Sequence, residues 1–451
     1  MRRGFGGSVR AVLALAGLAA ALSASACAAP LLPSGTRGDG GGSGDPADLE
    51  PVSCATPVGS ADFATAGAQD VGLDRGDLAR AVGYASARGA QSVRVYRHGC
   101  LVARSGNDPL TENMRLPGWS MTKGVVSMVV GRAEELGLLS VDDPISAYLD
   151  TAALDLDPAH ASLTPRHFLT QTSGLRMAWV NDLWAAGSQD SVADVLSRPF
   201  QAEPGSTFLY AQTAVSVLVA VVEGASGEDF QDFARRELFE PIGIPRSDWR
   251  WQRDAAGTTQ GFAFLDMTPT AWARLGHLLL REGRWGTEQL LDPVYIQQGR
   301  TGTTANAGYG FLWRTNSGGW NIDSGVPYYK RTEEPNWPGL PRDAFALSGL
   351  FDQIVIVVPS LDMVVVRLGL PTEVFGDPLG ESPGIRPSFT WRFDRLVMAA
   401  VADTQVHDPG PWSHEYDDTP LDVSNIIEPA LPPFEVRIPG SLGELFALAG
   451  R

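Results

Sequence analysis

The chain has 451 residues, of which 44% are hydrophobic and 19% are charged. This composition is typical of a globular protein with a large core and excludes an intrinsically disordered chain. The formal net charge of -17 at pH 7 argues against nucleic acid or an anionic membrane surface as a partner, because both would repel the protein.

Residues 1–26 have the features of a secretory signal peptide. Arginines near the start precede an apolar run over 11–22, and small residues follow this run up to Cys27. The run is too short to be a permanent membrane span. Two endings remain open, namely ordinary cleavage after the small residues 24–26 or lipidation of Cys27 as in a bacterial lipoprotein. Both predict an exported protein, either secreted or periplasmic or held at the cell envelope, that would contact a membrane only through this lipid.

Residues 27–55 are rich in Gly, Pro and Ser, and we expect them to form a flexible tether before a folded domain over 56–405. After export, Cys54 and Cys100 would meet an oxidising compartment. The two alternatives for them are a disulfide and a pair of buried thiols. The sequence contains no His-x-x-x-His, Cys-x-x-Cys or Walker-type glycine loop. We therefore expect no metal and no cofactor.

Strand patterns lie near both ends of the expected domain, and helical patterns lie between them. Alternating and valine-rich runs predict two hairpins, with strands over 91–96, 100–103, 354–358 and 363–368. Helices are predicted over 120–138, 164–170, 213–224, 230–238 and 269–282. This order predicts an α+β fold in which both chain ends build one antiparallel sheet, with helices packed on it. Residues 406–451, rich in Pro and Asp, are expected to form an irregular extension.

Lysine is nearly absent from this chain. Of the 35 lysines and arginines only two are lysines, Lys123 and Lys330. Lys123 follows Ser120 by three residues at the predicted start of a helix, so that both side chains face the same way. A buried lysine can lose its proton, whereas arginine stays charged. The spacing therefore predicts a serine nucleophile beside its general base.

A second element lies in the segment 203–212, where a Pro-Gly turn and a short extended piece lead to Tyr210 and Gln212 at the predicted start of a helix. With this element the sequence resembles the serine hydrolases of the β-lactamase and penicillin-binding superfamily. The resemblance is to the branch with class C β-lactamases, family VIII esterases and nylon-oligomer hydrolases. Further similar stretches follow in the family's order, namely Thr172-Ser173-Gly174-Leu175, Pro241-Ile242-Gly243-Ile244 and Tyr309-Gly310-Phe311-Leu312-Trp313.

The resemblance implies a β-lactamase/transpeptidase-like fold, with a mostly helical subdomain, and an acyl-enzyme mechanism without a cofactor. Ser120 would attack a carbonyl, and Lys123, whose pKa burial would lower, would accept the serine proton directly or through Tyr210. Tyr210 would pass the proton to the leaving group and then help to activate water. A Ser-His-Asp mechanism is disfavoured, because Thr122 stands where a nucleophile elbow has glycine.

The third motif of the family corresponds to Leu347-Ser348-Gly349. The resemblance implies that Ser348 and Gly349 line the substrate and that the backbone N–H groups of Ser120 and Leu350 form an oxyanion hole. Leu347 departs from the lysine or histidine of the penicillin-recognising members and offers no charge to a substrate carboxylate. This departure favours an esterase or amidase over a β-lactamase or D,D-carboxypeptidase.

Gln212 also departs from the family, which has asparagine there, so the amide that orients the substrate or the lysine sits on a longer arm. Trp119, Trp179, Trp184 and Trp313 are candidates either for an apolar acyl pocket or for the core. The expected partner is a small-molecule ester or amide, and the sequence does not indicate an oligomeric state. A different class of function also stays open, that of a catalytically inactive cell-envelope binding protein with the same fold.

Overall fold

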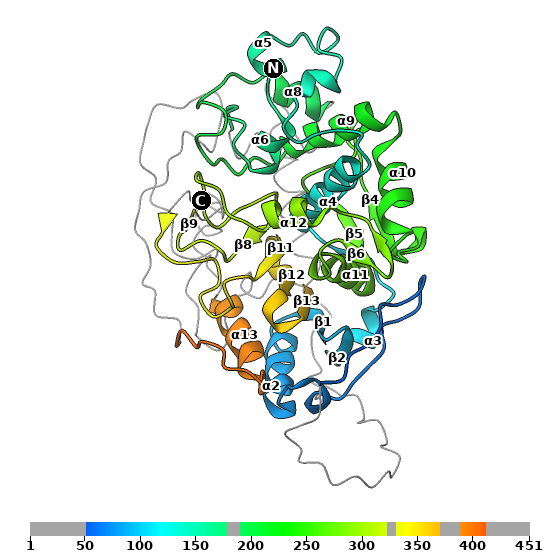
Figure 1. Cartoon of the computed structure of the whole chain (residues 1–451), viewed down its shortest axis with the longest axis vertical. Coiled ribbons are helices and arrows are strands. Elements are labelled where there is room, and N and C mark those ends of the chain that lie inside the picture. The colour runs from blue at the N-terminus through cyan, green and yellow to red at the C-terminus, as the bar shows by residue number, and fades with distance from the viewer. Residues whose placement is uncertain (1–50, 178–189, 323–330, 370–387, 412–451) are drawn as a thin grey trace, which may run out of the picture.

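The computed structural model describes residues 51–177, 190–322, 331–369 and 388–411. A six-stranded antiparallel sheet runs through the middle of the molecule (Figure 1). Its strands, in spatial order, are β2 (Cys100–Arg104), β1 (Ala90–Arg97), β13 (Met363–Gly369), β12 (Gln353–Val358), β11 (Phe345–Gly349) and β8 (Arg314–Thr315). Of the strands that the structure describes, the first and the last in chain order are neighbours, since β1 pairs with β13. The prediction of one sheet built from both chain ends is confirmed.

Side chains of the central strands alternate between two apolar clusters, as the two-residue period of a strand requires. In β12, Ile354 and Ile356 belong to one cluster, and Val355 and Val357 belong to the other. The first cluster is covered by two helices that lie side by side in Figure 1, α2 (Arg75–Ser86) and α13 (Ser388–Ala399). The opposite face packs against α11 (Pro269–Leu280) and α4 (Met121–Glu135). The sheet is therefore covered by helices on both faces.

A mostly helical region lies on the side of α4 that faces away from the central sheet (Figure 1). Its helices are α5 (Pro158–Ala161), α6 (Pro165–Leu169), α8 (Ser191–Leu196), α9 (Val215–Ser226), α10 (Phe230–Ala234) and α12 (Pro293–Gly299). Helix α3 (Asp108–Thr111) packs near β1. The short strands are β3 (Leu116–Pro117), β4 (Trp249–Trp251), β5 (Leu265–Met267), β6 (Arg284–Trp285), β7 (Glu288–Gln289), β9 (Asn321–Ile322) and β10 (Arg331–Thr332).

The bounds of all five predicted helices differ from the observed ones, and three of the differences are informative. The helix predicted over 120–138 ends at Glu135, before Gly137 with a φ of 67°. The one predicted over 230–238 is an α-helix only to Ala234 and continues as a π-helical turn over Arg235–Phe239. The one predicted from 213 begins at Val215. The spacing of apolar residues predicts that a helix forms, but it does not determine the residue at which the helix begins or ends.

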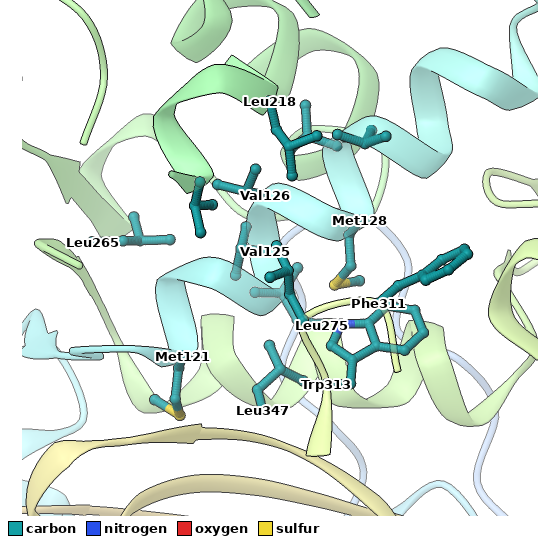
Figure 2. Close-up of a cluster of buried hydrophobic side chains, with 14 of the residues drawn as sticks. Met121, Val125, Val126, Met128, Leu218, Leu265, Leu275, Phe311, Trp313 and Leu347 are labelled. Atoms are coloured by element: carbon teal, nitrogen blue, oxygen red, sulfur yellow. The ribbon is translucent and has the colours of Figure 1, made fainter. Parts of the chain in front are cut away.

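Helix α4 is enclosed by protein along most of its length. Twelve of its fifteen residues are buried. Figure 2 shows apolar side chains around it from several elements, including Leu218 of α9, Leu265 of β5 and Leu347 of β11. A helix buried on nearly all sides reads as continuously apolar, so the polar residues at its start need a separate explanation. Lys123 is one of them, with an exposed fraction of 1%.

The chain before β1 is fastened to the β1–β2 hairpin by a disulfide between Cys54 and Cys100. At the other end, residues 406–411 lie along α13, where Arg395 forms an ion pair with Asp408. The expected signal peptide, the lipidation candidate Cys27 and residues 412–451 lie outside the described residues. Among the helices that the structure describes, none combines the length and apolarity needed to span a bilayer.

Candidate active site

Ser120 and Lys123 lie together at the start of α4. Ser120 occupies the N-cap position, and Lys123 donates a hydrogen bond to Ser120 Oγ at 3.0 Å. The lysine Nζ also donates to Gln212 Oε1 at 2.7 Å and to the backbone oxygen of Phe262 at 2.9 Å. An ammonium group has three hydrogens, and the Tyr210 hydroxyl is a further partner, so these oxygens and the hydroxyl together surround the amine. The buried amine is thus held by three oxygens from different parts of the chain.

Tyr210 completes this cluster. Its hydroxyl interacts with both Ser120 and Lys123, and its ring centroid lies 4.8 Å from Lys123 Nζ. Burial alone would raise the pKa of the Tyr210 phenol. The charges of Lys123 and Arg314, together with these hydrogen bonds, outweigh burial and leave the pKa below its usual value. A phenol with a lowered pKa beside a serine hydroxyl is suited to accept and return a proton.

Tyr210 and Gln212 lie in a non-helical segment, five and three residues before α9 begins at Val215. The sequence had placed them at the start of a helix. Instead, Leu209 N–H donates to the backbone oxygen of Gln171 and thereby fastens the segment to the neighbouring loop. Both side chains are buried, and the longer amide of Gln212 reaches the lysine directly.

The end of strand β11 meets the start of α4. A Cβ atom added to Gly349 would come within 2.3 Å of the backbone oxygen of Gly118 and 3.1 Å of Ser120 N. Only glycine permits this approach, which brings the next residue, Leu350, beside the serine. Leu350 is 54% exposed, whereas Ser348 and Gly349 are half-buried.

Leu347 points away from this junction into the core. It is fully buried, and its side chain lies against Gly124 of α4 together with Trp313 (Figure 2). The leucine is therefore a packing residue at a position where related enzymes were expected to carry a polar group. Its environment has no room for a solvated charge.

Three further residues belong to the site although the sequence assigned them no role there. Phe262 contributes a backbone oxygen, which no side-chain pattern could reveal. Tyr309 packs edge-on against Tyr210, with ring centroids 6.0 Å apart, and burial and the nearby Tyr210 raise its pKa. Arg314 directly follows the matched Tyr-Gly-Phe-Leu-Trp stretch, and this adjacency was the available signal.

Arg314 brings a positive charge to the same side of the site through sheet pairing. It pairs with Ala346, the residue before Leu347, and forms an isolated bridge with Tyr309. Its charge acts on the phenols of both Tyr210 and Tyr309, and opposes the rise in pKa that burial causes in each. A cation is therefore present near the tyrosine although the third motif lacks one.

The tryptophan candidates separate into two groups. Trp119 is half-buried, precedes Ser120 with a φ of 49°, and packs edge-on against Phe351 with centroids 5.4 Å apart. Trp313 belongs to the core and donates its indole N–H to the backbone oxygen of Gly124. Trp179 and Trp184 lie outside the described residues.

The part of the chain that is described contains no cluster of histidine, cysteine or acidic side chains suited to a metal ion.

Comparison with known proteins places these features in a family context. The family described as Beta-lactamase matches residues 77–369, which is more than half of the chain. The esterase EstB of Burkholderia gladioli is 29% identical over 163 residues, covering 32% of this chain and 41% of EstB. "Putative penicillin-binding protein PbpX" of Bacillus subtilis strain 168 is 27% identical over 138 residues, covering 31% of this chain and 33% of that protein. The chain thus spans about a third to two fifths of these curated relatives.

Among solved structures, EstCE1, described as a hydrolase with promiscuous acyltransferase activity, has a TM-score of 0.51. The alignment covers 71% of this chain and 98% of EstCE1 at 18% sequence identity. At this identity the likeness concerns the fold.

Proposed function

The chain belongs to the beta-lactamase family and has the β-lactamase/transpeptidase-like α+β fold, and we propose that it is a serine hydrolase that cleaves an ester or amide through an acyl-Ser120 intermediate. The observation that carries the proposal is the buried cluster of Ser120, Lys123 and Tyr210. A binding protein without catalysis would gain nothing from burying a lysine amine against a serine hydroxyl, because such burial is costly.

In acylation, Ser120 Oγ forms a bond to the substrate carbonyl carbon as it loses its proton. Either Lys123 or Tyr210 is the base, depending on which of the two carries the proton that they share. If Lys123 is neutral, two N–H groups bond to Gln212 and Phe262, and the nitrogen lone pair faces the serine hydroxyl. If Lys123 is charged and Tyr210 ionised, the phenolate accepts the proton. Tyr210 has a lowered pKa, which supports its part in either arrangement.

The tetrahedral intermediate then collapses. The bond to the leaving alcohol or amine breaks, and the proton taken from Ser120 passes through Tyr210 to the leaving group. In deacylation Tyr210 accepts a proton from water, the resulting hydroxide attacks the acyl carbon, and Ser120 Oγ leaves with a proton. We assign the oxyanion hole to the backbone N–H groups of Ser120 and Leu350. The close approach of Gly349 to Ser120 N supports this assignment.

The proposed substrate is an ester or amide with an apolar acyl group. Support comes from Leu347, which leaves the third motif without a cation, and from the apolar residues next to the proposed oxyanion donors, namely Trp119 with its ring partner Phe351, and the exposed Leu350. The test is labelling by a fluorophosphonate probe together with turnover of p-nitrophenyl esters. Labelling and turnover in the wild type, both lost in Ser120→Ala, are expected. An unlabelled, inactive wild type would instead favour the binding-protein alternative.

A second candidate function is that of a β-lactamase or D,D-carboxypeptidase acting on an anionic substrate. The observation that favours it is the charge of Arg314 near Tyr210, which could attract a carboxylate in place of the missing third-motif cation. A chromogenic cephalosporin and a peptide ending in D-Ala-D-Ala distinguish the two. Faster turnover of either than of short esters would replace the esterase proposal with this one.

We also propose that the protein is exported, with residues 1–26 as the signal, 27–55 as a tether and 56–405 as the hydrolase domain. The disulfide between Cys54 and Cys100 supports an oxidising compartment. Metabolic labelling with palmitate distinguishes the two signal endings. Incorporation that is lost in Cys27→Ser would identify the lipoprotein, and no incorporation would leave ordinary cleavage.

A further inference from the structure

The hairpin turn that follows the third motif has an unusual backbone. Strands β11 and β12 are joined by Leu350, Phe351 and Asp352, and the last two have φ values of 63° and 59°. Non-glycine residues rarely adopt this left-handed region, least of all bulky ones such as phenylalanine. Strained backbone of this kind persists only where the surroundings determine it strongly. The turn must therefore be held by other parts of the protein.

Two buried side chains, those of Arg367 and Gln353, donate hydrogen bonds to the backbone of this turn. Arg367 of β13 donates to the backbone oxygen of Phe351 at 2.7 Å and to that of Asp352 at 3.3 Å. Gln353 donates to the same oxygen of Phe351 at 2.9 Å. The Gln353 amide also bonds in both directions to the backbone of Gly369 at the end of β13. The Phe351 carbonyl thus receives two donors, and both donors are anchored in the central sheet.

The burial of Arg367 is difficult to explain by stability alone. Its exposed fraction is 0%, and burial lowers the pKa of its guanidinium, while the nearby Asp352 opposes this effect. A buried cation bound mainly to backbone oxygens costs desolvation that an apolar residue would avoid. In some proteins a buried ionic group of this kind specifies one arrangement of the chain.

The turn is also connected to the residue before the nucleophile. Phe351 packs edge-on against Trp119, and Trp119 itself has a φ of 49°. Trp119 immediately precedes Ser120, and Phe351 immediately follows Leu350. The aromatic contact therefore joins the two residues that flank the proposed oxyanion donors. Moving the turn would move one donor relative to the other.

We propose that Arg367 and Gln353 are positioning residues that lock the left-handed turn after β11 and thereby fix the Leu350 N–H relative to the Ser120 N–H. The inference rests on the proposed hydrolase function. Neither residue touches the substrate. Both bond to the Phe351 carbonyl, which lies two peptide groups after the Leu350 N–H, and so hold the short turn that carries this N–H. Oxyanion donors contribute to catalysis only when they meet the developing charge at hydrogen-bond distance, so small displacements are costly to the rate.

The test compares Arg367→Met with a matched control, Arg274→Met. Arg274 is also a buried arginine whose guanidinium binds three backbone oxygens, those of Gly59, Ala61 and Ile242, but it lies in α11 away from the turn. Each variant is assayed with p-nitrophenyl butyrate for kcat and KM. Each is also assayed with phenylboronic acid, which forms a tetrahedral anionic adduct on serine and so reports oxyanion binding. Thermal melting monitors the fold.

For Arg367→Met we expect kcat and boronate affinity to fall together, by about tenfold to a hundredfold, with KM changed less than about threefold. Arg274→Met should lower the melting temperature yet keep kcat and boronate affinity within about threefold of the wild type. Arg367→Lys, which keeps the charge but not the fork of donors, should be intermediate. Gln353→Leu tests the same carbonyl if Arg367→Met does not fold, and we expect the same parallel loss.

Wild-type boronate affinity in a folded Arg367→Met or Gln353→Leu would overturn the positioning role. An equal loss in Arg274→Met would also overturn it, since the effect would then follow from general destabilisation. Fluorophosphonate labelling of the wild type separates this outcome from failure of the hydrolase function. A labelled wild type with an unaffected Arg367→Met refutes the positioning role alone, whereas an unlabelled wild type refutes both.

Discussion

Lys123 Nζ lies closer to Gln212 Oε1, at 2.7 Å, than to Ser120 Oγ, at 3.0 Å. The glutamine is therefore the nearer of these two side-chain partners of the lysine. Because a side-chain amide oxygen carries no net charge, it orients the amine without the strong preference for the ammonium form that a carboxylate would impose. The arm of Gln212, longer than that of the asparagine that the sequence resemblance led us to expect, reaches the lysine.

Replacing this glutamine should separate orientation from charge. Gln212→Asn shortens the arm by one methylene, and we expect kcat/KM to fall by roughly tenfold because the amine loses its partner. Gln212→Glu should stabilise the protonated amine and move the acidic limb of the kcat/KM profile to higher pH. Profiles from pH 5 to pH 10 measure both effects. An unshifted limb in Gln212→Glu would show that the lysine does not act as a base.

Replacement of Lys123 tests the role of its proton. Lys123→Arg should be as damaging as Lys123→Ala, lowering the acylation rate by about a thousandfold, because a guanidinium keeps its proton. The measurement is the rate of fluorophosphonate labelling, and Lys330→Arg is the matched control. Near-normal labelling of Lys123→Arg would contradict general-base catalysis by this residue.

The positive charge of Arg314 should be visible in the pH dependence of deacylation. This charge helps to lower the pKa of Tyr210, so its removal in Arg314→Met raises that pKa. Deacylation requires the phenolate to accept a proton from water, and its acidic limb should therefore move to higher pH. Arg314→Lys keeps the charge and should shift less. The measurement is the hydrolysis rate of a preformed acyl-enzyme, and identical limbs in all three proteins would refute this coupling.

His277 should make the protein sensitive to acid. Burial and the charges of Arg281 and Arg274 lower the pKa of His277 to about 3. Below pH 6.5 the unfolded chain binds a proton that the folded protein excludes, so stability falls as pH decreases from 6.5 towards 3. The loss approaches about 1.4 kcal/mol for each pH unit.

His277→Phe should reduce this dependence, because the ring packs between Phe63 and Tyr96 at centroid distances of 4.5 and 5.0 Å and an apolar ring fits there. Urea unfolding at pH 7, 6, 5 and 4 measures it. If the wild type and the variant lose stability in parallel, the histidine is not the titrating group.

The parts of the site that depend on local spacing could be predicted from the sequence. Ser120 and Lys123 are one helical turn apart, and Gly349 ends a strand whose valine-rich partner was recognisable. Arg314 and Arg367 could not be predicted in the same way, because their places follow from strand register between distant segments. A shift of one residue would reverse the face on which each arginine lies. Helix ends were missed because loop contacts decide them.

The bond between Cys54 and Cys100 has one more effect. Strand β2 is the outermost strand of the sheet, and residues 64–66 run beside it, with Leu101 N–H donating to the oxygen of Ala64 and Ala66 N–H donating to that of Leu101. This short segment covers part of the sheet edge, where a strand of another molecule could otherwise pair. Reduction of the disulfide would free the segment from β2, expose the edge and favour aggregation.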